Sequence, residues 1–144
     1  EGLRMAHVRG VLASGWGGLS SDNDPETVFQ LDAAPHDWLF PRMAAIVHHG
    51  GCGTTAACFR AGRPSIVCPF FGDQPYWGRR VYELGVGSKP IPQKKLHAEN
   101  LATAIREVLT TPQIRQRAEK IGEKIRQEEG IANAVSFIEK MLTH

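Results

Sequence analysis

Residues 47–55 read Val-His-His-Gly-Gly-Cys-Gly-Thr-Thr, and this stretch decides the fold. The apolar residues 44–47 lead into it, which indicates a buried strand that ends at the two histidines. Three glycines within four positions indicate a sharp turn, and the two threonines open a helical segment of small residues. The N-terminus of such a helix presents unpaired N–H groups and a positive dipole end, so we expect an anion site here.

This glycine turn differs from the common phosphate-binding loops. No Lys follows its last glycine, as a Walker A loop requires, and the G-x-G-x-x-G spacing is missing. A strand–glycine–helix turn by itself is as often structural as functional. The adjacent His48 and His49 at its mouth favour a functional site.

Composition excludes several classes of protein. The 144 residues fit one domain with its own core, and a formal net charge of +2 is too small for a nucleic-acid footprint. No apolar run approaches the roughly 20 residues of a membrane span, and no signal peptide is visible. The three cysteines lack C-x-x-C spacing, which disfavours zinc and disulfides and favours a reducing, cytoplasmic compartment.

Strands and helices alternate along the chain, which predicts an α/β fold. We expect a Rossmann-like parallel sheet with helices on both faces, in one domain over residues 1–144. The expected strands cover residues 10–14, 28–31, 44–48 and 65–68, with an edge strand at 86–91, and the expected helices cover residues 54–61, 73–85 and 98–109. Two more helices carry apolar stripes, one at Ile114, Ala118, Ile121 and Ile125 and one after Gly130. Ligands of such sheets bind beyond the carboxyl ends of the strands, where we expect His36, His49, Thr54 and Asp73.

Three blocks of sequence resemble a known family. Residues 35–40 (PHDWLF), 48–55 (HHGGCGTT) and 69–77 (PFFGDQPYW) are similar to the donor-binding, C-terminal half of UDP-sugar glycosyltransferases of the GT-B fold. They are most similar to the sterol 3-beta-glucosyltransferases. The resemblance runs from the Gly15–Gly18 turn to residues 130–134, so it covers nearly the whole chain.

The resemblance implies roles for eight residues. His49 would donate a hydrogen bond to the diphosphate, and Gly53 and Thr54 would offer backbone and hydroxyl donors to the same phosphates. Cys52 falls where relatives often carry Ser or Ala. The loop from Ala34 to His36 would border the uracil ring. Asp73 and Gln74 would hold the sugar hydroxyls, because a carboxylate accepts from hydroxyls and an amide both donates and accepts.

Each role has a structural alternative that the residue types alone leave open. Asp73 and Thr54 are also good helix N-caps, and Asp37 is placed to cap a short turn through residues 38–40. His48 reads as a half-buried histidine with satisfied hydrogen bonds. A metal site at the two histidines is disfavoured, because adjacent strand residues face opposite sides. Trp38 and Trp77 fit core packing, and His36 fits either reading.

The implied function is UDP-glucose binding in an enzyme that transfers a hexose to a sterol or related lipid hydroxyl. No metal or other cofactor is expected, no partner is a nucleic acid, and peripheral contact with a membrane would suit a lipid acceptor. In this family the acceptor pocket and catalytic base lie in an N-terminal domain, so we expect the chain to be a fragment that is inactive alone. The alternatives are a stand-alone donor-binding subunit of a split GT-B transferase, or a non-catalytic interaction domain with a relic pocket.

Overall fold

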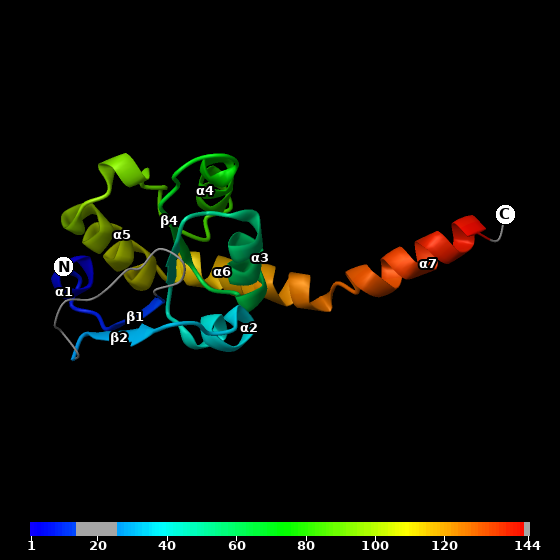
Figure 1. Ribbon diagram of the computed structural model, residues 1–144, viewed down its shortest axis with the longest axis horizontal. Helices are drawn as coiled ribbons and strands as arrows, with labels where there is room; N and C mark the ends of the chain where they lie inside the picture. The colour runs from blue at the N-terminus through cyan, green and yellow to red at the C-terminus, as the bar shows by residue number, and fades with distance from the viewer. Residues whose placement is uncertain (14–25, 143–144) are drawn as a thin grey trace.

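The computed structural model describes residues 1–13 and 26–142 (Figure 1). Ser14 and the predicted Gly15–Gly18 turn lie outside the described residues. The elements are α1 (Gly2–Met5), β1 (Gly10–Ala13), β2 (Val28–Leu31), α2 (His36–Leu39), η2 (Phe40–Arg42), β3 (Ile46–His48), α3 (Cys52–Ala61), β4 (Ser65–Val67), α4 (Gln74–Glu83), η3 (Gln93–Lys95), α5 (Ala98–Thr110), α6 (Pro112–Gln127) and α7 (Gly130–Leu142).

The strands pair in parallel, as predicted, but in the described residues they form two sheets instead of one. β1 pairs with β2, and Gly10 lies opposite Val28. β3 pairs with β4, and Ile46 lies opposite Ser65. The predicted edge strand at residues 86–91 is wrong: Gly87 makes only an isolated bridge to Ser65, although the N–H of Ile91 still donates to Val67 O at 2.9 Å.

Helices cover both faces of β4, as the α/β prediction requires. Ile66 and Cys68 pack with Ala102, Ile105 and Val108 of α5 on one face. Val67 packs on the other face with Val81 of α4 and Ala118 of α6. A third cluster joins β3 to α2 and α3 through Ile46, Leu39 and Cys58. Burial raises the pKa of the Cys58 thiol to about 12 and that of Cys68 to about 11, so both cysteines act as small apolar core residues.

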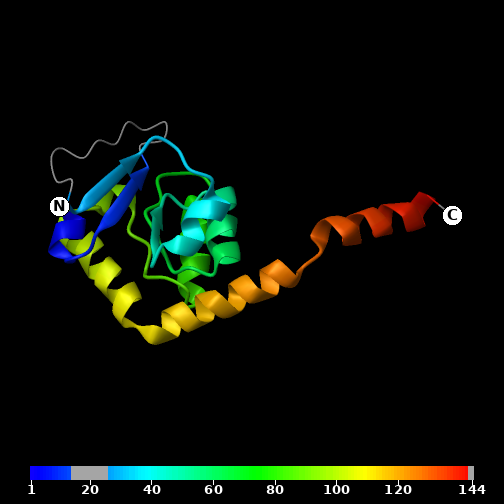
Figure 2. The ribbon, with the colours of Figure 1, turned by 90° about the horizontal axis from the view of Figure 1, so that it is seen from below.

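The C-terminal helix leaves the body of the molecule. α7 extends away from the packed elements in two perpendicular views (Figures 1 and 2). Its predicted apolar stripe forms on a helix as expected, but the stripe is exposed instead of packed. Ile131 and Leu142 are 85% and 80% exposed, and Val135 and Ile138 are about half exposed.

The two β–α turns of the β3–β4 sheet place the candidate site. β3 runs into α3 through residues 49–51, and β4 runs into α4 through residues 68–73. Because the strands are parallel, both turns lie at the same edge of the sheet.

Candidate functional site

The glycine loop after β3 lies directly against the first residue of α4. Gly50 has φ +91°, a conformation that residues with a Cβ rarely adopt. A Cβ at this position would lie 2.6 Å from Val67 Cγ1 and 3.1 Å from the backbone oxygen of Gln74. Glycine at position 50 therefore brings the loop and the Asp73–Gln74 turn together, as the sequence predicted for this edge.

The N-terminus of α3 has free amide groups. The helix begins at Cys52 with Gly51 as N-cap, two residues before the predicted start, and no side chain caps it. The first helical hydrogen bond runs from the Thr55 N–H to Gly51 O at 2.9 Å. Among the described contacts, the N–H groups of Cys52, Gly53 and Thr54 have no partner. The alternative reading of Thr54 as an N-cap is therefore wrong.

Space is open in front of these amides. A Cβ on Gly53 would meet no described atom within 4 Å, and both Cys52 and Gly53 are exposed. A ten-residue helix with three unpaired N–H groups and an open approach is a general anion site. Gly53 lets an anion approach the backbone closely.

His48 differs from the prediction that its hydrogen bonds are satisfied. Its Nδ1 accepts from the Gly50 N–H at 3.1 Å, which places its hydrogen on Nε2. Nε2 is buried without a partner among the described groups. Burial, then the charges of His49 and His36, lower the pKa of His48 to about 4. At neutral pH, His48 is therefore an uncharged imidazole with one free buried N–H.

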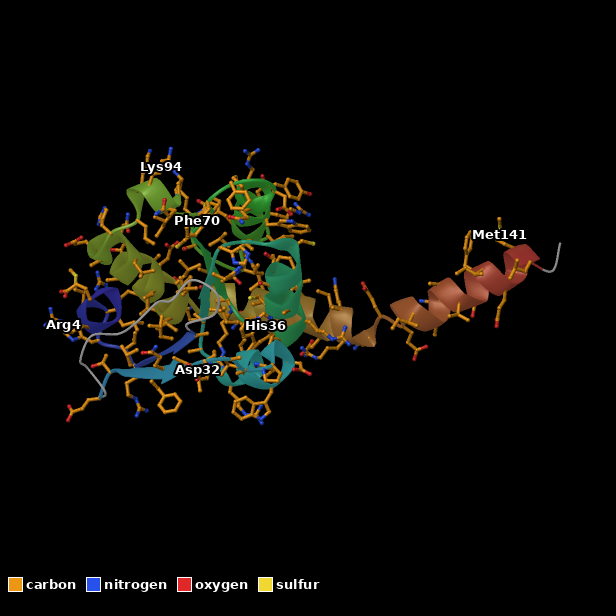
Figure 3. The ribbon with its side chains drawn as sticks, in the orientation of Figure 1. Arg4, Asp32, His36, Phe70, Lys94 and Met141 are labelled. Atoms are coloured by element: carbon orange, nitrogen blue, oxygen red, sulfur yellow. The ribbon has the colours of Figure 1, made fainter. Side chains whose placement is uncertain are left out.

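His49 and His36 lie near His48, as predicted for this edge. The rings of His48 and His49 are 6.5 Å apart and nearly perpendicular. The exposed His49 ring covers Gly51, because a Cβ there would collide with His49 Nε2. His36, labelled in Figure 3, stacks on Phe40 with ring centroids 4.3 Å apart.

The loop before α2 packs against the α2–α3 core. Ala34 is half-buried and contacts that cluster, so it has a packing role in addition to any contact with a ligand. The N-cap of α2 is Pro35 and not Asp37; the Asp37 carboxylate instead accepts the next backbone N–H, that of Trp38, at 3.0 Å. Trp38 is 53% exposed under the guanidinium of Arg42, so the core-packing reading of Trp38 is wrong.

Asp73 occupies the N-cap position of α4, but its side chain caps no N–H. Its Oδ2 accepts from the Trp77 indole Nε1 at 2.9 Å, which fixes the carboxylate on the exposed edge. Oδ1 has no partner among the described groups. Asp73 therefore keeps one oxygen available to a ligand, in a fixed orientation.

Gln74 is buried and braces the preceding loop. Its Oε1 accepts from the N–H groups of Phe70 and Phe71, at 2.8 and 3.2 Å. Both partners are donors, so the oxygen of the amide must face them. Only the Nε2 group of Gln74 is left to contact a ligand.

Two further properties concern the described residues, 1–13 and 26–142. They contain no group of three or more His, Cys, Asp or Glu side chains that could hold a metal ion. None of their helices is long and apolar enough to cross a membrane.

Comparison with known proteins identifies the family. A protein-family model described as "Erythromycin biosynthesis protein CIII-like, C-terminal domain" matches residues 19–140. The chain belongs to this family. The resemblance to the C-terminal half of GT-B glycosyltransferases, inferred from the three sequence blocks, is thereby confirmed.

Curated relatives of this EryCIII-like domain are much longer proteins. Sterol 3-beta-glucosyltransferase UGT80B1 of Arabidopsis thaliana is 44% identical over 99% of the chain, which covers 23% of that protein. The sterol 3-beta-glucosyltransferase of Aspergillus clavatus is 43% identical over the whole chain, which covers 11% of it. The chain thus spans about a quarter or less of these relatives.

Solved structures confirm the fold. The structure of the glycosyltransferase VinC in complex with dTDP superposes on 82% of this chain, with 28% sequence identity and a TM-score of 0.75. The matched region is 30% of the VinC chain. The structure of the spinosyn forosaminyltransferase SpnP superposes on 99% of this chain and on 37% of the SpnP chain, with a TM-score of 0.82. Its sequence identity is 20%, so this match supports the fold alone.

Proposed function

We propose that this chain is the donor-binding domain of a glucosyltransferase that transfers glucose from UDP-glucose to a sterol or related lipid hydroxyl. The observation that carries the proposal is the open N-terminus of α3, with its unpaired amides of Cys52, Gly53 and Thr54, beside the Asp73–Gln74 turn. Relatives aligned over these same residues are named sterol 3-beta-glucosyltransferases, which supports glucose as the transferred sugar and a sterol as the acceptor.

The diphosphate would bind at the start of α3. Amide N–H groups and a helix dipole stabilise the negative charge that UDP gains as the glycosidic bond breaks, and they do so without reorganising. His49, whose ring is exposed, would add a side-chain hydrogen bond, whereas the Nε2–H of His48 is buried. No resident metal ion is proposed, because amides and imidazoles supply the contacts to the phosphates. The loop from Ala34 to His36 would border the uracil, and residues 31–33 before it contain no aromatic residue to stack on the base.

The sugar would lie beside α4. Asp73 Oδ1 can accept from a hydroxyl, and Gln74 Nε2 can donate to one. The pocket that binds the acceptor and the base that activates the acceptor's hydroxyl are proposed to lie in the part of the intact protein outside these 144 residues. Attack from the face opposite UDP would invert the anomeric carbon.

Substitution of Gly53 by Ala tests the diphosphate site. The structure has room for the methyl group, so we expect the melting temperature to stay the same or rise, as for Gly→Ala at a helical position. The methyl would occupy the approach to the amides, and we expect calorimetry to show UDP affinity weakened by about 1–3 kcal/mol, the usual cost of overpacking. Gly130→Ala, at an equally open position on α7, is the matched control and should bind UDP normally.

The calorimetric titrations of the wild type and of all variants with UDP are run without divalent metal. His49→Ala removes the imidazole and should also weaken the binding of UDP by about 1–3 kcal/mol, the range for a hydrogen bond to a charged group. If the wild-type chain gives no heat with UDP, or only with magnesium, the proposed site is wrong. If Gly53→Ala binds UDP as tightly as Gly130→Ala does, the diphosphate does not lie at the start of α3.

A further inference from the structure

The Asp73 carboxylate at the candidate sugar site is held by the indole of Trp77. The indole Nε1–H donates to Asp73 Oδ2 at 2.9 Å, and the backbone N–H of Trp77 donates to the backbone oxygen of Asp73 at 3.2 Å. Asp73 is exposed, whereas Trp77 is partly buried. An exposed carboxylate is thus fixed by a side chain that lies one helical turn further along α4.

The start of α4 explains why Asp73 contacts Trp77 and caps no N–H group. An N-cap residue ordinarily has extended backbone, and its side chain accepts from the second or third helical N–H. Asp73 instead has helical angles, φ −83° and ψ −7°, and Pro75 at the second helical position has no N–H. Residues four apart share a helix face, and helical side chains lean toward the N-terminus, so the indole reaches the carboxylate.

Packing holds Trp77 and its helix in place. The rings of Tyr76 and Trp77 meet edge to face, with centroids 5.3 Å apart and an angle of 79° between the planes. Further along α4, Val81 is fully buried, and a Cβ on Gly78 would lie 2.9 Å from Pro90 Cβ. The indole therefore fixes Asp73 Oδ2 relative to the core, which also fixes the direction of Oδ1.

Asp73 and Gln74 are each left with one group for a sugar. Oδ1 of Asp73 accepts hydrogen bonds. Nε2 of Gln74 donates them, because its Oε1 already accepts from the N–H groups of Phe70 and Phe71. A fixed acceptor beside a fixed donor fits one arrangement of sugar hydroxyls. A carboxylate that is free to rotate would follow a hydroxyl of the opposite configuration.

We propose that Trp77 determines sugar specificity: by holding Oδ2 of Asp73, it makes the donor site prefer glucose to hexoses that differ in the configuration of one hydroxyl. Trp77 acts through Asp73 and needs no contact with the sugar, so it is a positioning residue. A hexose of the wrong configuration leaves the fixed carboxylate without a partner, which costs affinity. The inference rests on the proposed function, because it requires the sugar to lie beside α4.

Two substitutions separate the indole N–H from the aromatic ring. Trp77→Phe keeps a ring but loses the donor. Trp77→Gln loses the ring but keeps an N–H donor that can pair with Asp73 four positions away. Calorimetry on the 144-residue chain measures the affinities of each protein for UDP, UDP-glucose and UDP-galactose, whose sugar has one hydroxyl of opposite configuration.

The affinity ratio of the two sugar nucleotides is the readout. The wild type should bind UDP-glucose at least about tenfold more tightly than UDP-galactose, because a charged acceptor left unpaired is costly. Trp77→Phe should lower this preference about three- to tenfold, since Asp73 regains rotamer freedom that binding must then remove. Trp77→Gln should keep the preference within about twofold of the wild type. The affinity for UDP alone should be the same in all three proteins.

A purely structural Trp77 predicts the opposite order. Loss of the ring would then matter more than loss of the donor, so Trp77→Gln would lower the melting temperature and the sugar preference more than Trp77→Phe does. A second measurement repeats Trp77→Phe in an Asp73→Ala background, which has no carboxylate to hold. There the substitution should change the affinity for UDP-glucose less than about twofold, because the two residues act as one unit.

Four results would overturn the inference while UDP binds normally. They are equal affinities of the wild type for the two sugar nucleotides, an unchanged preference in Trp77→Phe, an equal loss of preference in Trp77→Gln, and an undiminished effect of Trp77→Phe in the Asp73→Ala background. Failure of the wild type to bind UDP would instead refute the proposed diphosphate site, and this inference with it.

Discussion

The pH dependence of stability should reveal the buried state of His48. Its Nδ1 accepts from the Gly50 N–H, and Nε2 is buried without a partner. Replacing it by Asn keeps a side-chain oxygen near the position of Nδ1, so the turn can still form, but Asn does not titrate. The variant therefore removes the charge that burial opposes and leaves the turn in place.

The size of the effect follows from the pKa. Burial lowers the pKa of His48 from an ordinary 6.5 to about 4, so the unfolded chain binds a proton on this residue more readily than the folded chain does. The contribution to folding is fully present above pH 6.5 and is lost as the pH falls toward 4, because the native state must then either bury a charge or unfold. The fall in pKa corresponds to about 3 kcal/mol, a large share of the stability of a small domain.

Urea unfolding at several pH values between 7 and 4 measures this loss. We expect the wild type to lose about 3 kcal/mol more than His48→Asn over this range. His7→Asn is the matched control, because His7 is exposed and has φ +56°, which Asn tolerates; it should follow the wild type. If wild type and His48→Asn lose stability in parallel, His48 is not held neutral by burial and the argument is refuted.

Two further predictions concern the sugar and the acceptor. Asp73→Asn and Gln74→Glu should each weaken the binding of UDP-glucose by about 1–3 kcal/mol and leave the binding of UDP nearly unchanged. Calorimetry with both ligands measures this difference. Equal losses of affinity for the two ligands would show that these residues do not contact the sugar. The purified 144-residue chain should transfer no radiolabelled glucose from UDP-glucose to cholesterol or ergosterol, because acceptor positioning and the base are proposed to lie outside it; measurable turnover would contradict this.

Sequence patterns predicted the element order well where packing follows local chemistry. α3 and α5 begin within two residues of their predicted starts, and the predicted stripe from Ile114 to Ile125 lies on α6, because glycine turns and apolar stripes are local signals. The prediction of a strand at residues 86–91 was wrong, because an apolar run indicates that a segment is buried but not that it pairs with a neighbouring strand. Residues 86–88 of that segment are buried beside β4, yet among residues 86–91 only Gly87 forms a bridge.

The candidate site was predictable in position but not in the state of its groups. The blocks around residues 48–55 and 69–77 placed the glycine loop beside the Asp73–Gln74 turn, and the structure does the same. The sequence could not separate His48 from His49, since adjacent histidines carry the same signal. Their difference comes from tertiary burial, which leaves one ring exposed and the other neutral with a free N–H.

Gln74 shows why a side chain can be structural and still serve a ligand. Its oxygen is committed to the N–H groups of Phe70 and Phe71, so the opposite side of the amide, Nε2, is fixed as a donor. Asp73 beside it is committed through Oδ2 to Trp77 and offers Oδ1 as an acceptor. A donor and an acceptor on adjacent residues match the hydroxyls of a sugar, each of which can donate one hydrogen bond and accept others. Gln74→Glu separates the two roles, because a carboxylate oxygen can still accept from both N–H groups while the donor toward the sugar is gone. The loop brace would then survive a change that costs sugar binding, an outcome that a purely structural Gln74 does not predict.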